Sequence, residues 1–121
     1  MKIAVCSQGD TLDSMADARF GRCAYFVIID PGTKHHEVIK NPSLSAGHGA
    51  GISTAQVLSD KGVTAVCTQN IGPHAHSALK AADITVFSIV GDKTVKEIID
   101  EYEKGMLEEQ TGANVTGQHQ A

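Results

Sequence analysis

Residues 24–40 read Ala-Tyr-Phe-Val-Ile-Ile-Asp-Pro-Gly-Thr-Lys-His-His-Glu-Val-Ile-Lys. The continuous apolar run from Tyr25 to Ile29 is typical of a strand that is buried on both faces of a sheet. In the four residues that follow, Asp30 to Thr33, Pro stands second and Gly third, as a type II turn requires. The chain then returns from His36 to Lys40. We therefore predict a β-hairpin over residues 24–40 with two antiparallel strands.

The segments around this hairpin alternate between apolar runs and helical patterns. Pro73 suits the first position of a helix, and Thr94-x-x-Glu97 is a capping box that starts another. We expect strands at residues 3–7, 63–68 and 84–90, and helices at 52–61, 73–82 and 94–104. Strands that are separated by helices run parallel through right-handed crossovers. The prediction is an α/β fold of three layers, α/β/α, with a mixed five-stranded sheet in which the second strand is antiparallel.

The length of the chain, 121 residues, fits one domain without an internal repeat. We predict a single domain over residues 1–105. Residues 106–121 are polar and show no period, which predicts a disordered tail.

Composition and charge exclude several classes of partner. The net charge is −4, aromatic residues make up 4% and there is no Trp, so we expect neither a nucleic acid nor an anionic membrane as partner. The first residues form a strand rather than an apolar export segment, and no run is long enough to span a membrane. Three cysteines without a CxxC pair do not resemble a secreted disulfide framework. We expect a cytoplasmic protein.

The predicted topology places three loops together. Ligands of open α/β sheets bind beyond the carboxyl ends of the parallel strands. The segments Gln8–Arg22, Asn41–Gly51 and Gln69–His74 all lie at that edge, so we expect them to converge on one crevice that carries the function.

Four motifs occur in these loops in a fixed order: Arg19-Phe20-Gly21-Arg22, Asn41-Pro42, the Gly-rich segment 47–51 leading into residues 52–56, and Gly72-Pro73. Together they resemble the dinitrogenase iron–molybdenum cofactor biosynthesis family, a family of nitrogenase accessory cluster carriers, over about residues 1–105. The resemblance implies a ribonuclease-H-like fold with sheet order 3-2-1-4-5. It also implies non-catalytic binding and carriage of an anionic metal–sulfur cluster, either an iron–molybdenum cofactor precursor or a thiomolybdate-type cluster that can contain copper. The partners implied are metallocofactor-assembly proteins or a recipient apo-protein.

Such a cluster needs fixed positive charge and many N–H donors. Arg19 and Arg22 would supply forked donors, the glycines would free backbone N–H groups, and the helix that follows residue 51 would add its dipole. The blander interpretation is a flexible connector beside solvated arginines. The predicted cluster-binding residues are Arg19, Phe20, Gly21, Arg22, Asn41, Gly47, His48, Gly49, Gly51, Gln69, Gly72 and His74.

Thiolates and imidazoles are candidate metal ligands, because soft sulfur suits iron, copper(I) and iron–sulfur clusters. Cys6, Cys23 and Cys67 all fall near the predicted carboxyl edge, and His48 and His74 could face the same crevice. His76, two residues beyond His74, is expected to face solvent. The alternative for each cysteine is a small buried apolar residue.

The sequence also bears on two other function classes. A metal-dependent nuclease of this fold class needs an acid within the first strand, but residues 3–7 have none. Asp10, Asp13 and Asp17 follow in the loop, where acids are most often solvated turn formers. We therefore predict no enzyme. The remaining alternative is a regulatory or scaffold protein that binds a nucleotide-binding ATPase or another protein through its tail or the acidic helix 96–103.

Overall fold

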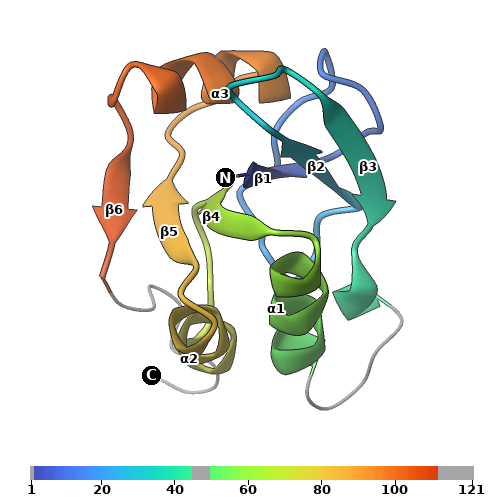
Figure 1. Cartoon of the computed structure of the whole chain (residues 1–121), viewed down its shortest axis with the longest axis vertical. Helices are drawn as coiled ribbons and strands as arrows, with labels where there is room; N and C mark the ends of the chain where they lie inside the picture. Colours follow the sequence, from blue (N-terminus) through green and yellow to red (C-terminus); the bar gives the residue numbers. More distant parts are fainter. Residues whose placement is uncertain (1, 45–49, 112–121) are drawn as a thin grey trace.

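The computed structural model describes residues 2–44 and 50–111, without side chains at residues 50 and 51. Its elements in chain order are β1 (Lys2–Ser7), β2 (Tyr25–Ile29), β3 (His36–Lys40), a short 3-10 helix η1 (Pro42–Leu44), α1 (Ala50–Asp60), β4 (Val63–Thr68), α2 (Pro73–Ala81), β5 (Thr85–Ser88), α3 (Val95–Glu103) and β6 (Glu108–Gln110) (Figure 1).

The six strands form one mixed sheet in the order β3-β2-β1-β4-β5-β6. Strands β1, β4 and β5 are parallel, and β2 runs antiparallel to both β1 and β3. Val5 in the central strand lies opposite Val27 of β2 on one side and Cys67 of β4 on the other. The predicted mixed α/β fold and the order 3-2-1-4-5 are confirmed.

The sixth strand, β6, is a correction to the sequence analysis, because it lies inside the segment predicted as a disordered tail. Glu108 and Gln110 pair antiparallel with Ser88 and Val86 of β5. Leu107, just before the strand, packs against the apolar core. The hydrogen bonds to β5 and the packing of Leu107 order this polar segment, whose sequence has no periodicity that would indicate a strand. The rest of the predicted tail, residues 112–121, lies outside the described residues.

Two apolar clusters cover the two faces of the sheet. Helices α1 and α2 pack on one face over a cluster that includes Cys6, Phe26 and Leu58. Helix α3 and the loop after β1 pack on the other face over a cluster that includes Cys67 and Ile98. Figure 1 shows α3 on one side of the sheet and α1 and α2 on the other. The predicted three-layer α/β/α arrangement follows from this alternation, because successive strand residues point to opposite faces.

Local signals in the sequence were mostly reliable at helix ends. The capping box of α3 forms in both directions between Thr94 and Glu97, and Pro73 is the first residue of α2. Gly62, after α1, adopts the left-handed conformation with φ of +82°, as a residue just beyond a helix commonly does.

The type II turn predicted in the hairpin is wrong, because Gly32 does not have a positive φ and Lys34 does (66°). The Asp30 side chain decides the turn: its Oδ1 accepts hydrogen bonds from the N–H groups of Gly32 and Thr33 at 2.9 and 3.4 Å. The backbone N–H of Lys34 closes the turn on the carbonyl of Asp30 at 2.7 Å.

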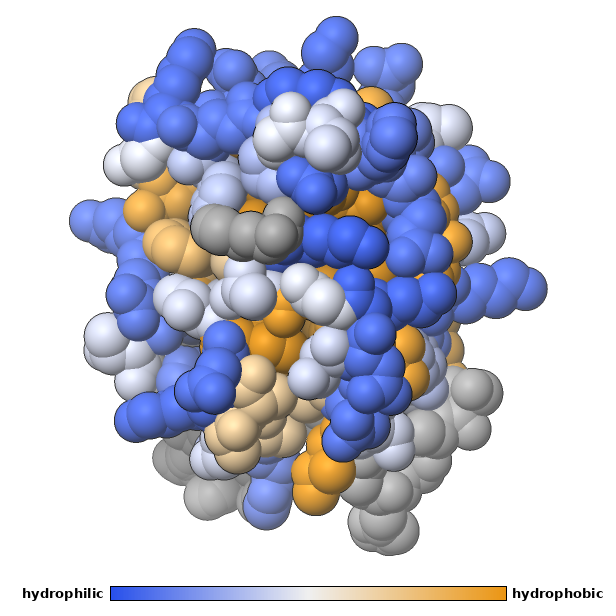
Figure 2. Space-filling view, in the orientation of Figure 1, coloured by the Kyte–Doolittle hydropathy of each residue, from blue (hydrophilic) through white to orange (hydrophobic). Residues whose placement is uncertain are grey.

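The face shown in Figure 2 is covered mainly by hydrophilic residues, with apolar atoms visible in patches between them. No helix within the described residues is long and apolar enough to cross a membrane.

Candidate functional site

The loop after β1 and the loop after β4 meet at the carboxyl edge of the sheet. The backbone N–H of Phe20 donates to the carbonyl of Asn70 at 3.1 Å. In return, the carbonyl of Ala18 accepts the N–H groups of Gln69 (3.0 Å) and Asn70 (2.6 Å) and the hydroxyl of Thr68 (3.1 Å). The predicted convergence of residues 8–22 with 69–74 is thus present. The middle of the third predicted segment, with Gly47, His48 and Gly49, lies outside the described residues.

Asn41 joins the end of β3 to the same edge. Its side-chain amide donates to the carbonyls of Phe20 (3.0 Å) and Cys23 (2.9 Å), and lies 3.3 Å from the Cys23 sulfur. Its Oδ1 accepts the N–H of Ser43 at 2.9 Å. The side chain is buried, and its amide is therefore engaged within the protein. Asn41, predicted to bind a cluster, here holds the loop 19–23 in shape.

Phe20, another predicted site residue, also points inward. It is 2% exposed and its ring packs on Phe26 with the centroids 5.4 Å apart. This contact fixes the middle of the Arg19–Arg22 motif to the core under α1 and α2. The flanking residues Arg19, Gly21 and Arg22 are exposed. The motif therefore has one buried residue, Phe20, that fixes it to the core, and three residues at the surface.

Asp17 is a functional candidate that the sequence analysis missed. It was expected to be a solvated turn former, but it is 4% exposed. Its Oδ1 accepts the backbone N–H and the Nε–H of Arg19 at 2.9 and 3.0 Å, and its Oδ2 accepts Nη2–H at 3.0 Å. Burial acts to raise the pKa of the Asp17 carboxyl, but the hydrogen bonds and charge of Arg19 outweigh it, and the pKa lies below its usual value. The signal in the sequence was the spacing of an acid two residues before an arginine.

The exposed part of this edge contains arginine side chains and glycines. The side chain of Arg22 has no hydrogen bond or ion pair within the described residues. A Cβ built at Gly21 or Gly72 would meet nothing within 4 Å, and neither glycine has a positive φ, so neither is required by the packing of the described residues. Gly72 is also the N-cap of α2 and provides no side-chain hydrogen bond to its first turn. We call Arg19, Gly21, Arg22, Gly72 and His74 the edge site.

The two histidines of α2 differ in their surroundings. His74 is exposed and, with Ile52 and Gln56 of α1, lines a groove of about 550 Å³ between α1 and α2. His76 was predicted to face solvent. Instead, its Nε2 lies 3.2 Å from the carbonyl of Gln110 in β6. The contact forms because β6 is ordered beside α2.

Gln69, the remaining predicted residue of this loop, is exposed at the edge. Its carbonyl accepts a hydrogen bond from the Gln110 side chain at 2.8 Å. The sixth strand is therefore tied to the loop that leads into the edge site. Gly51 lies in the first turn of α1, one residue after the helix begins.

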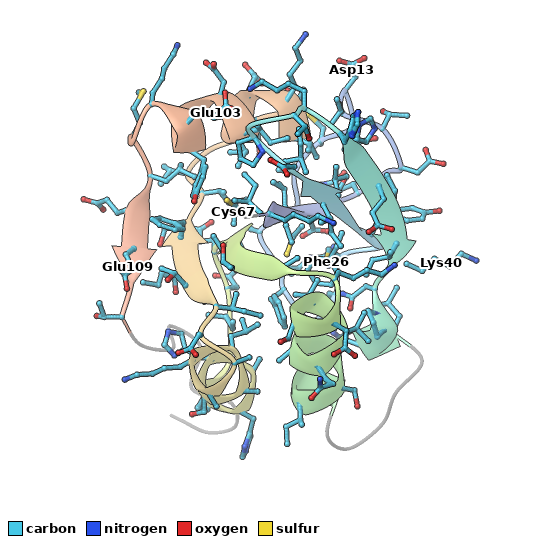
Figure 3. All side chains as sticks on the ribbon, viewed as in Figure 1. Asp13, Phe26, Lys40, Cys67, Glu103 and Glu109 are labelled. Atoms are coloured by element: carbon cyan, nitrogen blue, oxygen red, sulfur yellow. The ribbon has the colours of Figure 1, made fainter. Side chains whose placement is uncertain are left out.

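The structure does not bring the three cysteines together. All are fully buried, and Cys6 and Cys23 belong to the core under α1 and α2, whereas Cys67 belongs to the core under α3. The registers of β1 and β4 explain this: Cys67 pairs with Val5, so it shares the face of Val5 and not that of Cys6. In the stick view of Figure 3, Cys67 and Phe26 lie among the strands, whereas Lys40 and Glu109 extend outward.

Burial also raises the pKa values of two of these thiols, Cys6 and Cys67. It raises the pKa of Cys67 to about 12. The pKa of Cys6 is raised by burial and further by its contact with Cys23. Among residues 2–44 and 52–111, no three His, Cys, Asp or Glu side chains are arranged to hold a metal ion. The predicted ligand His48 lies outside this part of the chain.

The fold and sequence of this chain are similar to those of known proteins. The chain is similar to the apo form of the orange protein from Desulfovibrio gigas, with 38% identity, a TM-score of 0.87 and coverage of 93% of this chain and 95% of that one. It is equally similar in sequence, at 38%, to a NifB-like protein from Thermotoga solved by NMR, with a TM-score of 0.79 and coverage of 89% and 91%.

A protein of Methanocaldococcus jannaschii with no assigned function is 33% identical over 111 residues, which are 89% of this chain and 90% of the relative. The sequence profile described as "Dinitrogenase iron-molybdenum cofactor" matches residues 1–105. This match covers most of the chain, including both loops of the edge site. The chain therefore belongs to the dinitrogenase iron–molybdenum cofactor family.

Proposed function

We propose that this protein binds an anionic metal–sulfur cluster at the edge site and carries it, without catalysis, during metallocofactor assembly. The observation that supports this most directly is the composition of the two loops that meet at this edge: they contain two exposed arginines and two glycines beside which space is open. The first turn of α2, which starts there, has no side-chain cap. Positive charge and uncapped backbone N–H groups at a helix start favour an anion.

The chemistry of the described residues also limits the kinds of metal–sulfur cluster that we propose as cargo. All three cysteines are buried, and burial raises the pKa of Cys6 and Cys67, so no sulfur of the three is exposed to a ligand at this edge. A cluster that needs several protein thiolates to complete its coordination would find no ligand there. A cluster whose metals are already coordinated by sulfide needs only hydrogen bonds and charge. Thiomolybdate-type anions, with or without copper, and a sulfide-rich iron–molybdenum cofactor precursor meet this condition.

An open edge suits reversible binding. Phe20 and Asn41 fix the loop from the inside, so the surface that meets the cargo is formed before binding. The cargo remains exposed on its outer side, where a second protein can take it. We propose a metallocofactor-assembly protein or a recipient apo-protein in the cytoplasm as that partner, with a nucleotide-binding ATPase as one candidate.

Reconstitution tests this function. The protein is incubated anaerobically with tetrathiomolybdate, with and without copper(I), and separately with iron, sulfide and tetrathiomolybdate, and is then desalted. We expect near-stoichiometric retention of metal with a visible charge-transfer band. Arg19→Ala/Arg22→Ala should lose most of it, whereas Lys61→Ala/Lys104→Ala, which removes the same charge from other surfaces, should retain it.

A Cys6→Ala/Cys23→Ala variant separates electrostatic from thiolate binding, once circular dichroism shows that it is folded. Retention by this variant supports the proposal. If wild-type protein retains no metal under any of these conditions, the carrier function is wrong, and a scaffold role toward another protein becomes the better hypothesis.

A further inference from the structure

We propose that Asp17 is the positioning residue of the edge site: it fixes the direction of the Arg19 guanidinium and cancels its net charge, so that Arg19 acts on an anion through directed N–H groups. This inference rests on the proposed function. It assigns a role to a buried carboxylate that the loop sequence alone suggested was a solvated turn former.

Backbone hydrogen bonds to β1 and to the end of β4 hold the segment that carries Asp17 and Arg19. The N–H of Asp17 donates to the carbonyl of Cys6 in β1 at 2.8 Å. The carbonyl of Ala18, between Asp17 and Arg19, accepts three hydrogen bonds from the end of β4 and the loop after it. The carboxylate is 5% exposed and the arginine side chain 59%. Asp17 is therefore part of the rigid sheet edge, and Arg19 projects from it.

The contacts leave a defined set of donors. A guanidinium has five N–H groups in a planar fork. One on Nε and one on Nη2 donate to the two oxygens of Asp17, both at 3.0 Å. The remaining three belong to Nη1 and Nη2 and have no partner among the residues that the structure describes. A bidentate pair of this kind adds geometric specificity as well as energy, so Arg19 meets the cargo in one orientation.

Arg19 and Arg22 also differ in the net charge that they present to an anion. Arg22 has no ion-pair partner within the described residues and acts as a full positive charge, whereas the Arg19–Asp17 pair is nearly neutral. An anion bound to Arg19 also experiences the Asp17 carboxylate, and this repulsion falls with distance. Phosphate concentrates its charge on a small oxyanion, while tetrathiomolybdate spreads it over four larger sulfurs. The pair therefore disfavours phosphate more than tetrathiomolybdate.

The first test needs no cargo. In ¹⁵N–¹H NMR spectra we expect the Nε–H of Arg19 to give a distinct, slowly exchanging signal, assigned by its loss in Arg19→Lys. Asp17→Asn should move this signal toward the position of free arginine and speed its exchange. An Arg19 signal that exchanges as fast as that of Arg22, the other arginine of the chain, or that is unchanged in Asp17→Asn, would overturn the positioning role.

The second test measures selectivity. Dissociation constants for tetrathiomolybdate and for inorganic phosphate are compared at several salt concentrations. For Asp17→Asn we expect the preference for tetrathiomolybdate over phosphate to fall by about tenfold, because the change removes both the directed pair and the carboxylate charge. The conservative variant Arg19→Lys keeps the charge balance but loses the bidentate fork, so its preference should fall by a smaller factor. Binding by Asp17→Asn should also become more sensitive to salt, since Arg19 then carries an unbalanced charge. Arg22→Gln should weaken both anions by similar factors.

The outcomes separate this inference from the proposed function. If wild-type protein binds tetrathiomolybdate and Asp17→Asn keeps the same preference, the carrier function stands and the role of Asp17 is wrong. If wild-type protein binds neither anion, the carrier function and the selectivity fail together, while the NMR signal still decides whether Asp17 positions Arg19.

Discussion

At the carboxyl edge of the sheet, long loops are held by buried polar side chains, whereas the connections at the opposite edge are closed by local turns. All the polar residues that are buried within the described part of the chain are at or beside the carboxyl edge, namely Ser7, Asp17, Asn41, Thr54 and Thr68. At the opposite edge, Lys34, Gly62 and Asp83 turn the chain with positive φ angles. The surface ion pair Lys61–Glu37 lies near the same connections.

The difference has a physical cause. A tight turn needs only one residue in an unusual conformation, so it carries no long-range requirement. A loop of the length of residues 8–24 loses much conformational entropy when it is ordered, and its backbone groups need partners when they are buried. Polar side chains that reach across the edge provide those partners. The conformational entropy lost in ordering these loops supports the proposal that they carry the function.

The largest effect on this comparison should come from Asn41→Ala. The change removes the donors to the buried carbonyls of Phe20 and Cys23 and leaves them without these partners. We expect the free energy of unfolding to fall by about 3 kcal/mol, measured by urea denaturation. A loss below about 1 kcal/mol would mean that the loop is held by Phe20 alone.

A smaller loss is expected for Asp17→Asn at neutral pH, because Arg19 remains accessible to water. The pKa of Asp17 is lowered in the folded state, so the stability from this pair is fully present above the unfolded pKa of about 4. It is lost as the pH falls through the lower, folded pKa. The difference in unfolding free energy between wild type and variant should therefore shrink in acid. A difference that stays constant between pH 7 and pH 2 would contradict the ion pair.

A pair of glycine variants compares the two edges directly. Gly62→Ala forces a Cβ into a left-handed conformation (φ +82°) and should cost about 1 kcal/mol. Gly72→Ala should change the stability by less than about 0.5 kcal/mol, because its φ is ordinary and its surroundings are open. Retention of tetrathiomolybdate should show the reverse order, with only Gly72→Ala weakened. Equal retention by both variants would remove Gly72 from the edge site.

The smallest effect is expected for Lys61→Ala. Its ion pair with Glu37 spans 3.2 Å, but the two side chains are 40% and 43% exposed. Exposed pairs of this kind contribute about 0.5 kcal/mol or less. Urea denaturation at low and high salt checks this, and a larger, salt-sensitive loss would show that the opposite edge depends on more than local turns.

The parts of the fold that depend on local sequence were predictable. The hairpin strands, the capping box at Thr94 and the helix start at Pro73 each follow from a few neighbouring residues. The convergence of the loops followed from topology alone. Asp17 was misjudged, and the structural contacts of Asn41 were not foreseen, because the burial of a polar side chain depends on which distant carbonyls and cations it meets, and a sequence pattern does not encode that. The strand β6 was missed because its stability comes from pairing with β5 and not from its own residues.

The pairing of β6 also affects how this protein behaves at high concentration. Strand β6 ends one side of the sheet, and its first two residues are Glu108 and Glu109. An unpaired strand edge is a template on which another chain can add, unless charge or shortness prevents it. Here the edge is three residues long and carries two negative charges. Two copies approaching edge to edge along β6 would repel each other, so the segment that completes the sheet also keeps neighbouring sheets from joining.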